Sequence, residues 1–328
     1  MNIAVLGAGA WGTALAISFA RTQAVTLWVH QADLYAALQS ARENQAYLPG
    51  HALPPALALS ADFAASVGNA QLAVVAAPVA ELRTTLRMLR EAAPSLPFLW
   101  VCKGLEAGSG LLPHQVAAEE MTDSATANGV LTGPSFAEEV ARGLPTAVTL
   151  ASVNTGFARS MAQALSSPRL RIYAGSDVVG AEVGGAVKNI LAIAAGICDG
   201  LGLGLNARAA LITRGLAETV RLGLALGARR ETLMGLAGMG DLILTCTGDL
   251  SRNRRVGLAL ANGQALETIT RELGHVAEGV FSAREVARRA AQLNVEMPIT
   301  QTVCAVLDGR LTAAEAVNLL MSRDTKDE

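Results

Sequence analysis

The sequence has few of the features that mark metal-binding, secreted or disulfide-bonded proteins. Among its 328 residues there are only four cysteines, and they are scattered: Cys102, Cys198, Cys246 and Cys304. No two of them form a CxxC pair, and no group of histidines and cysteines has the spacing of a metal site. We therefore expect no bound metal and four free, buried thiols of the kind found in the reducing cytoplasm.

An excess of charge of one sign and a long apolar run are also missing. The net charge of −2 provides no general attraction for nucleic acid or for an anionic membrane, so any phosphate must be held locally. The mean hydropathy is +0.36, but the longest apolar candidate, around residues 190–198, is too short to cross a bilayer. No cationic segment precedes the first apolar run, as one does in a secretory signal. We expect a cytoplasmic protein without nucleic-acid or membrane partners.

Composition and length predict a globular protein of two domains. Hydrophobic residues make up 51% of the chain and charged residues 16%, and 328 residues exceed the comfortable size of one hydrophobic core. Up to about residue 173, short apolar runs alternate with helical patterns, which is typical of a parallel sheet with helices on both faces. Strands are predicted at 3–6, 25–29, 72–76, 98–102, 129–131, 147–151 and 170–172, helices at 79–91, 113–121 and 155–165, and a loop at 47–55.

Beyond residue 178 the strand pattern stops, and helical patterns follow one another to the end of the chain. Helices are predicted at 180–198, 207–225, 230–236, 252–261, 268–272, 281–293, 300–307 and 312–321. The change predicts a domain boundary near Asp177, with a doubly wound α/β dinucleotide-binding domain at 1–178 and an all-helical substrate-binding and catalytic domain at 179–328. We expect substrate chemistry in the cleft between such domains.

The first 20 residues carry the most specific pattern in the chain. The apolar run 3–6 leads directly into GAGAWG at residues 7–12, and an alanine-rich helical pattern follows. In a dinucleotide-binding turn, the first glycine permits the tight turn, the second lets the main chain approach the pyrophosphate, and the third lets the helix pack closely on the strand. The pattern predicts a nucleotide site on the N–H groups of a helix N-terminus.

Three candidate ligands follow other predicted strands. His30 stands where an NAD-specific domain often has an acid for the ribose 2′-hydroxyl, and a histidine there tolerates a 2′-phosphate, which favours NADPH slightly unless His30 is a plain surface residue. Lys103 follows the strand at 98–102, where it either points into the ligand crevice of an α/β sheet or begins an exposed loop. Gly133 opens the sequence GPSF, which either brings main chain close to the nicotinamide or is only a turn.

The helix predicted at 180–198 contains Gly184, Gly185 and Lys188 on one face. Glycine in a helix interior costs about 1 kcal/mol relative to alanine, so the pair indicates that another backbone or a flat ligand approaches there. A lone lysine in an apolar stretch must have its charge solvated or paired. We favour a catalytic role for Lys188 over a side chain that reaches from a buried helix to solvent.

Two downstream segments add charged candidates. Asp241 directly follows GMG at 238–240, and it either acts in the site or caps a helix. Ser251, Arg252 and Asn253 open the helix predicted at 252–261, with Ser251 as its N-cap. A helix N-terminus with arginine and asparagine suits a phosphate dianion, which main-chain N–H groups, the helix dipole and a guanidinium can bind together. The alternative is a solvated basic turn.

Together these motifs resemble the bacterial NAD(P)-dependent glycerol-3-phosphate dehydrogenases over nearly the whole chain. The resemblance rests on GAGAWGTAL (7–15), KGLE (103–106), GPSFA (133–137), GGAVKN (184–189), NARAALITRGL (206–216), GMGDLILT (238–245) and SRNRR (251–255). It implies a 6-phosphogluconate-dehydrogenase-like fold and reversible hydride transfer between NAD(P)H and dihydroxyacetone phosphate. The product, sn-glycerol 3-phosphate, would supply glycerophospholipid synthesis.

The resemblance also implies roles for the residues that match family motifs. It places the cofactor, NADP or NAD, against Gly7, Gly9, Ala10, Trp11, Gly12, His30, Lys103, Ala137, Arg252, Val276 and Glu278. It places the substrate at Lys103, Gly133, Ser135, Lys188, Asp241, Ser251, Arg252 and Asn253. Lys188 would be the general acid and base, Asp241 would orient it, and Lys103 would add positive charge. Ala10 departs from the family, where serine is frequent, and the choice between NAD and NADP stays open.

Two other interpretations remain open at this point. A dehydrogenase of the β-hydroxyacid or 6-phosphogluconate type also has a lysine on the helix that joins its domains, although Lys103-Gly104 and the pattern at 251–255 argue against it. A non-catalytic dinucleotide-binding sensor would have no need of Lys188, Asp241 and Arg252. We also expect a homodimer, because the apolar helical domain could supply a dimer face.

Overall fold

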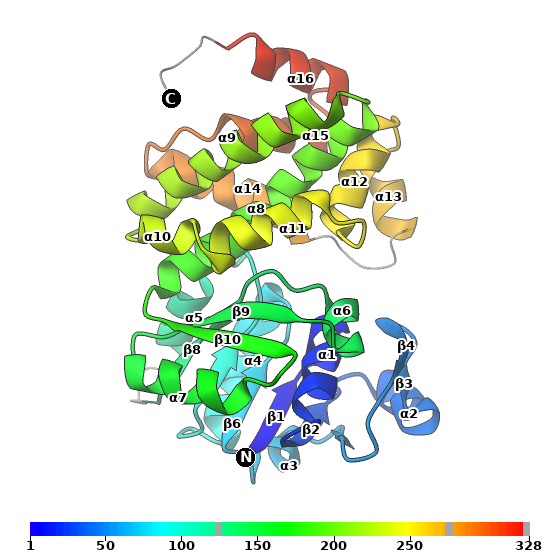
Figure 1. The fold of residues 1–328 in the computed structure, drawn as a ribbon, viewed down its shortest axis with the longest axis vertical. Coiled ribbons are helices and arrows are strands. Elements are labelled where there is room, and N and C mark those ends of the chain that lie inside the picture. The colour runs from blue at the N-terminus through cyan, green and yellow to red at the C-terminus, as the bar shows by residue number, and fades with distance from the viewer. Residues whose placement is uncertain (122–125, 273–277, 324–328) are drawn as a thin grey trace. The chain divides into compact units, whose positions relative to one another are not determined.

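The computed structural model describes residues 1–121, 126–272 and 278–323. The chain forms two compact units, of which the first comprises Met1–Lys103 and Leu111–Ala181 and the second comprises Gly104–Gly110 and Glu182–Glu328. Within the described residues, every strand belongs to the first unit, and the second unit consists of helices and their connections (Figure 1).

An eight-stranded sheet forms the centre of the first unit. Its strands are β1 (Asn2–Leu6), β2 (Ala24–Trp28), β5 (Ala58–Ser60), β6 (Leu72–Val75), β7 (Phe98–Trp100), β8 (Asn128–Thr132), β9 (Thr146–Ala151) and β10 (Leu170–Gly175). They lie in the order β10-β9-β8-β7-β6-β1-β2-β5. All seven predicted strands are confirmed. The edge strand β5 was not predicted, because three residues are too few to show a periodic pattern.

The sheet is mixed, which corrects the prediction of a parallel sheet. Strand β9 pairs antiparallel with β8, whereas β10 pairs parallel with β9 and the remaining neighbours are parallel. Central strands bury both faces, as in β6, where all four residues are fully buried. Such a strand is a continuous apolar run whichever way it points, so the sequence pattern does not contain its direction.

The segment predicted as a loop at 47–55 contains a strand. Strand β4 (Leu48–Ala52) pairs antiparallel with β3 (Glu43–Asn44), with an irregular register. Arg42 closes this hairpin from a left-handed backbone conformation, with φ of 48°, and its guanidinium donates to the carbonyl of Pro54 at 2.6 Å. The prediction was wrong because tertiary hydrogen bonds, and not an alternating apolar pattern, hold this hairpin together.

Seven helices accompany the sheet in the described part of the first unit: α1 (Ala10–Phe19), α2 (Ala32–Ala41), α3 (Phe63–Val67), α4 (Val79–Ala92), α5 (Pro113–Glu120), α6 (Ala137–Arg142) and α7 (Thr155–Leu165). Helix α1 packs against β1 and β2, and α7 packs against β9 and β10. The side chain of Asn154 caps α7 by accepting a hydrogen bond from the Phe157 amide at 3.0 Å. The three helices predicted here are confirmed.

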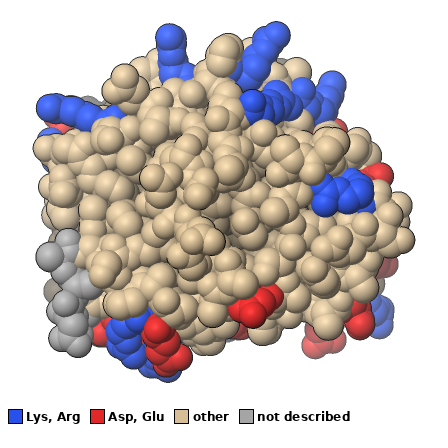
Figure 2. Space-filling model, turned by 90° about the horizontal axis from the view of Figure 1, so that it is seen from below, with Lys and Arg blue, Asp and Glu red and all other residues tan. Residues whose placement is uncertain are grey.

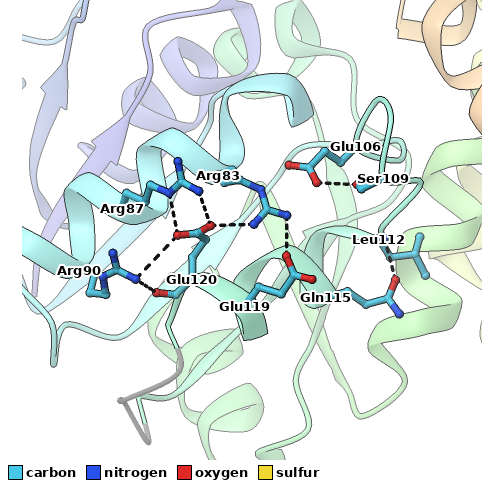
Figure 3. A network of polar contacts seen from close by, with 9 residues as sticks. All are labelled: Arg83, Arg87, Arg90, Glu106, Ser109, Leu112, Gln115, Glu119 and Glu120. Atoms are coloured by element: carbon cyan, nitrogen blue, oxygen red, sulfur yellow. Dashed lines mark hydrogen bonds and ion pairs between the residues drawn. The ribbon is translucent and has the colours of Figure 1, made fainter.

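Arginines of α4 meet glutamates of α5 in the network drawn in Figure 3. The carboxylate of Glu120, with a side chain only 7% exposed, accepts hydrogen bonds from Arg83 at 2.7 Å and from Arg87 at 2.9 Å. Arg90 donates to the main-chain carbonyl of Glu120, and Arg83 also reaches the exposed Glu119. The bond from Arg87 is the main reason why the pKa of Glu120 lies below its ordinary value, against the opposing effect of burial.

The second unit is a set of helices: α8 (Val178–Gly200), α9 (Gly204–Ala225), α10 (Arg230–Leu233), the π-helix η1 (Leu236–Gly240), α11 (Asp241–Thr247), α12 (Arg252–Ala261), α13 (Leu266–Glu272), α14 (Glu278–Gln292), α15 (Pro298–Leu307) and α16 (Ala313–Met321). The eight predicted helices are confirmed, with ends that shift by a few residues. The π-helix and α11 were not predicted, because the glycines at 235–240 suggested a loop.

Helix α8 corrects the expectation about apolar length. It has 23 residues and is long and apolar enough to cross a membrane, because neither its glycines nor Lys188 interrupts it. However, 94% of its most apolar window is buried inside the protein. A helix that is apolar on all sides is the expected centre of a helical core, so α8 is a core helix.

Glycines allow α12 to cross α8 at close range. A Cβ atom on Gly196 would lie 2.0 Å from the carbonyl oxygen of Arg254, and one on Gly257 would lie 2.0 Å from that of Ile193. The close crossing places Asp199 of α8 beside α12, where its carboxylate accepts a hydrogen bond from Arg254 at 2.8 Å. The four cysteines are all free and buried, as predicted.

Charged side chains are sparse over much of the face shown in Figure 2. Lysine and arginine lie mainly toward its margins, and acidic residues are found near them. This face therefore has no broad cationic patch of the kind that holds a nucleic-acid backbone.

Candidate functional site

The predicted nucleotide turn connects β1 to α1, and its first and third glycines have the roles that the sequence suggested. Gly7 has φ of +122°, in the region that favours glycine, and a Cβ atom there would lie 2.8 Å from the carbonyl oxygen of Ala76. A Cβ atom on Gly12 would lie 2.0 Å from the Gly7 carbonyl oxygen. These two positions accept no side chain, because the helix start and the strand end are in contact.

Gly9 differs from the other two glycines of the turn. It is the N-cap of α1, and a Cβ atom built on it meets no protein atom within 4 Å. Its side-chain position therefore faces open space next to the first N–H groups of a helix, which have no partner within the helix. A dinucleotide pyrophosphate fits such a place, because a bound phosphate would occupy the space that a Cβ atom would fill. Ala10 and Trp11, the other two predicted contacts, are the first residues of α1.

His30 is exposed and follows β2 directly. Its ring lies 5.3 Å from that of Trp28, at an angle of 51°. The indole of Trp28 is in turn fixed by a 3.3 Å hydrogen bond to the Ala61 carbonyl. The imidazole is accessible at the end of the strand next to β1, which is where the adenosine ribose of a dinucleotide binds in a doubly wound sheet.

Three predicted substrate residues meet at the ends of β7 and β8. The carbonyl oxygen of Gly133 accepts hydrogen bonds from Lys103 Nζ at 3.4 Å and from Ser135 Oγ at 2.9 Å. Gly133 itself has φ of +139°, which favours glycine. In the described chain, the buried Thr132 hydroxyl just before it has no hydrogen-bond partner. This strand end therefore presents an ammonium group and a polar main chain, with Ala137 nearby at the start of α6.

In the second unit, Lys188 and Asp241 form a buried ion pair, as the sequence analysis expected. Lys188 is 8% exposed and Asp241 is fully buried. The ammonium group donates to Asp241 Oδ1 and, at 3.0 Å, to Thr245 Oγ1. Thr245 donates its own proton to the Asp241 main-chain carbonyl at 2.6 Å. The lysine is therefore held in one position with its charge balanced, which is the requirement for a group that donates and accepts protons.

The glycine at 184 explains how Asp241 reaches Lys188. A Cβ atom on Gly184 would lie 2.3 Å from the Ala237 carbonyl oxygen, so the π-helix η1 lies directly against α8. The approaching group is thus another backbone, which decides between the two possibilities left open above. Gly240 is the N-cap of α11, so Asp241 is the first helical residue and does not cap the helix. A π-helix at such a point is common in functional sites.

Sequence analysis missed Thr245 and Asn189. The signal for Thr245 was its position four residues after Asp241, on the same helix face. Asn189, next to Lys188, accepts a hydrogen bond from Asn253 at 3.0 Å and donates to Glu278 at 3.2 Å. Its own signal was weaker, because an asparagine in an apolar helix needs partners that the local sequence does not contain.

Cys246 is no candidate nucleophile, although it lies beside Thr245. Burial raises the pKa of its thiol to about 12, because a thiolate loses its hydration there. Within this cluster, the group that can exchange a proton is Lys188.

The predicted phosphate socket at the start of α12 is partly confirmed in its geometry. Ser251 is the N-cap, and its hydroxyl accepts from the Arg254 amide at 3.2 Å. Asn253 is buried and bonded through both ends of its amide, to Asn189 and to the amide of Gly279. Arg254 is paired with Asp199 and Asp249.

Arg252 is exposed and has no protein ion pair within the described residues. Of the three arginines at 252–255, it is therefore available to a ligand beside the helix N-terminus. Glu278, predicted to contact the cofactor, is the first residue of α14 and lies in the Asn189 network. Val276, the other predicted contact on this segment, lies outside the described residues.

A strand that leads into a glycine-rich helix start, and a buried lysine–aspartate pair in a helical unit, define the class of nicotinamide-dinucleotide-dependent dehydrogenases. Residues 2–158 match the model of the NAD-dependent glycerol-3-phosphate dehydrogenase N-terminus, and residues 177–318 match that of its C-terminus. The chain belongs to the NAD(P)-dependent glycerol-3-phosphate dehydrogenase family.

Full-length relatives agree with this assignment. The glycerol-3-phosphate dehydrogenase (NAD(P)+) of Dechloromonas aromatica is 63% identical over 328 residues, which cover 100% of this chain and 99% of the relative. That of Aromatoleum aromaticum is 60% identical and covers 100% of both chains. A crystal structure of glycerol-3-phosphate dehydrogenase from Coxiella burnetii is 42% identical, covers 98% of this chain and 99% of its own, and has a TM-score of 0.94. The predicted Rossmann-type, 6-phosphogluconate-dehydrogenase-like fold is confirmed.

Proposed function

We propose that this chain reduces dihydroxyacetone phosphate to sn-glycerol 3-phosphate with NAD(P)H, and catalyses the reverse reaction. Membership of the family supports an NAD(P)-dependent oxidoreductase. The observation that carries the proposal is the buried contact of Lys188 with Asp241 and Thr245, because it provides a fixed proton donor in a helical unit of this family.

Lys188 is the general acid of the proposed reduction and the general base of the oxidation. When bound, the dinucleotide supplies or accepts the hydride. Negative charge that develops on the substrate oxygen is stabilised by the ammonium group, which then transfers a proton to that oxygen. Asp241 and Thr245 hold the ammonium in place, and Asp241 balances its charge when no anion is present.

The turn at 7–12 is the proposed holder of the pyrophosphate. Main-chain N–H groups at the start of α1 donate to the phosphate oxygens, and the missing side chain of Gly9 leaves room for them. His30 lies near the adenosine ribose in this proposal. The further cofactor contacts are Lys103, Ala137, Arg252, Val276 and Glu278.

The start of α12 is the proposed holder of the substrate phosphate. Arg252 offers two parallel donors to a phosphate, and the helix dipole adds a favourable field at the same place. Ser251 and Asn253 contribute through a fixed helix start. Lys103, Gly133 and Ser135 are the proposed substrate contacts of the first unit, where the lysine adds positive charge. Remote phosphate binding holds the reacting carbonyl in place and so lowers the entropic cost of reaction.

The direct test compares dihydroxyacetone phosphate with unphosphorylated dihydroxyacetone in NADPH and NADH oxidation. The proposal expects rapid oxidation that requires the phosphate. Cofactor binding without oxidation of either dinucleotide would overturn the proposed reaction, and it would support a non-catalytic dinucleotide-binding sensor instead. Oxidation that does not depend on the phosphate would place the substrate in another class of two-domain dehydrogenase.

We further propose a cytoplasmic homodimer without nucleic-acid or membrane partners. The free, buried thiols support a reducing compartment, and exposed apolar residues of the second unit, such as Leu205 at 71% exposure, support a subunit contact. The net charge of −2 gives nucleic acid no general attraction. Sedimentation at micromolar concentration tests the dimer. The product would supply glycerophospholipid synthesis.

A further inference from the structure

Asn44 is a fully buried polar residue that neither the predicted motifs nor the proposed function explains. It lies at the end of β3, in the hairpin that was predicted in part as a loop. Its side chain is 0% exposed, although asparagine is mostly found at protein surfaces. A buried amide of this kind has to find partners for two donors and one acceptor.

The partners of Asn44 lie in the nucleotide turn. Its Nδ2 donates to the carbonyl oxygen of Ala8 at 2.8 Å and to Thr13 Oγ1 at 2.8 Å. Its Oδ1 accepts from the Tyr47 amide at 3.1 Å. Thr13 belongs to α1 and is also fully buried. One side chain thus joins the hairpin, the turn and the first helix.

The bond to Ala8 fixes the peptide between Ala8 and Gly9. A trans peptide is planar, and its C=O and N–H groups point in opposite directions. Because the Ala8 carbonyl is held toward Asn44, the Gly9 N–H is turned away from the hairpin. Gly9 is also the residue whose side-chain position faces open space. The amide that would donate to a phosphate is therefore oriented before a ligand arrives.

The hairpin is itself anchored, so it can act as a support. The Gly50 amide donates to Glu43 at 2.8 Å, and the Leu53 amide donates to the Arg42 carbonyl at 2.7 Å. The Arg42 guanidinium holds the carbonyl of Leu57 at 2.9 Å. A rigid support matters because a binding turn that is already ordered loses less entropy when the ligand binds.

We propose that Asn44 is a positioning residue for dinucleotide binding, which orients the Ala8–Gly9 peptide of the glycine-rich turn. This inference rests on the proposed use of that turn for the cofactor. Asn44 acts through the main chain of the turn and needs no contact with the ligand.

The test measures the dissociation constants of NADPH and NADH by calorimetry for the unmodified chain and for Asn44→Ala and Asn44→Asp. The aspartate variant keeps the size and the acceptor for Tyr47, but it has no donor for Ala8. We expect the dissociation constant of both dinucleotides to rise about tenfold or more in each variant. At saturating dinucleotide, kcat and the KM for dihydroxyacetone phosphate should stay unchanged.

Ser152→Ala is a matched control. Ser152 is also fully buried in the first unit, and its hydroxyl donates to the Asn128 carbonyl, in a strand other than those that meet the turn. It should lower the melting temperature without changing dinucleotide affinity. If the Asn44 variants also lose thermal stability alone, with unchanged affinity, the inference is overturned and Asn44 is merely structural.

Thr13→Val keeps the test decisive if the Asn44 variants do not fold. It removes one acceptor of Asn44 Nδ2 and should raise the dissociation constants several-fold, while Thr13→Ser should restore them. A folded Thr13→Val variant with unchanged affinity would contradict the inference. If the unmodified chain binds neither dinucleotide, the proposed function fails instead, so the two failures are distinguishable.

Discussion

The glycine-rich turn of the first unit offers a ligand main-chain N–H groups, whereas the Lys188 cluster of the second unit offers a charged side chain. The turn is contiguous, at residues 7–12, and two of its glycines exclude side chains by direct contact. The cluster joins Lys188 to Asp241 and Thr245, which lie 53 and 57 residues further along the chain. The first site is therefore visible in a short motif, and the second depends on how helices pack.

The two regions also differ in how they meet the cost of burying polar groups. In the turn, hydrogen bonds of Asn44 satisfy the main chain from a neighbouring hairpin. In the cluster, opposite charges and a hydroxyl satisfy one another. A substitution in the turn should therefore change binding, and one in the cluster should change turnover.

The largest effect is expected for Lys188→Met. Turnover should fall about 10²- to 10⁴-fold, because the proton donor is lost while methionine keeps much of the side-chain volume. Dinucleotide affinity should stay the same. Steady-state rates and calorimetry on the same preparation test both statements. Turnover close to that of the unmodified chain would remove Lys188 from the mechanism.

The next effect is expected for Arg252→Ala. Loss of a bidentate charge pair with the phosphate should lower kcat/KM for dihydroxyacetone phosphate by about 2 to 4 kcal/mol. Arg255→Ala is the matched control, because Arg255 is equally exposed in the same helix and has no proposed role. Equal losses in both variants would indicate a general effect of charge, and no loss in either would place the phosphate elsewhere.

The glycines of the turn provide a matched pair within one motif. Gly12→Ala should destabilise the protein by about 2 kcal/mol or more, because its Cβ atom would overlap the Gly7 carbonyl. Gly9→Ala should leave the melting temperature unchanged and weaken dinucleotide binding about tenfold, because its Cβ atom occupies the phosphate space. Thermal denaturation and calorimetry separate the two outcomes. Undiminished affinity in Gly9→Ala would show that the phosphate lies elsewhere.

A smaller change is expected for His30→Asp. A carboxylate near the adenosine ribose repels a 2′-phosphate and accepts from a 2′-hydroxyl, so the ratio of kcat/KM for NADPH to that for NADH should fall about tenfold. His51→Asp in β4 adds the same charge away from the proposed ribose position and serves as the control. An unchanged ratio would separate His30 from cofactor choice.

The smallest effects concern stability, and they should have opposite pH dependence in the two units. Arginines lower the pKa of Glu120, so its contribution is present above the ordinary value of 4.5 and is lost as the pH falls through the folded-state value. Glu120→Gln should therefore reduce the free energy of unfolding by about 1 kcal/mol at pH 7, with a difference that shrinks in acid.

Glu218 of α9 should behave in the opposite way. It is buried at the start of α15, where its carboxylate accepts from the amides of Ile299 at 2.6 Å and Thr300 at 3.2 Å, yet burial raises its pKa above 4.5. The unfolded chain ionises first, so stability falls as the pH rises from 4.5 through the folded-state value. This fall should be absent in Glu218→Gln. Urea denaturation at several pH values measures both glutamates, and parallel profiles would contradict the assignment.

Much of the fold followed from local pattern, and its exceptions have physical causes. Seven strands and eleven helices were predicted near their observed positions, because buried strands and amphipathic or apolar helices leave periodic patterns. The direction of β9 left no such signal, since a doubly buried strand has the same composition either way. The hairpin of β3 and β4 was missed because Arg42 and Asn44 hold it through distant groups.

The candidate residues followed the same division. Gly7, Gly9 and Gly12 were assigned correctly from spacing alone, because each main-chain requirement selects glycine locally. For Asp241, spacing could not decide between a helix cap and a partner of Lys188. Packing of the π-helix against Gly184 made that choice.

The sequence by itself determined the class of each unit, the nucleotide turn and the family to which the chain belongs, because these depend on the order of residue types along a few contiguous segments. Only the tertiary structure decided the partners of buried polar groups: Thr245 for Lys188, Asn253 and Glu278 for Asn189, and the Ala8 carbonyl for Asn44. A buried donor or acceptor must be satisfied, but the requirement says nothing about which distant residue will satisfy it. That depends on which helices and strands come into contact.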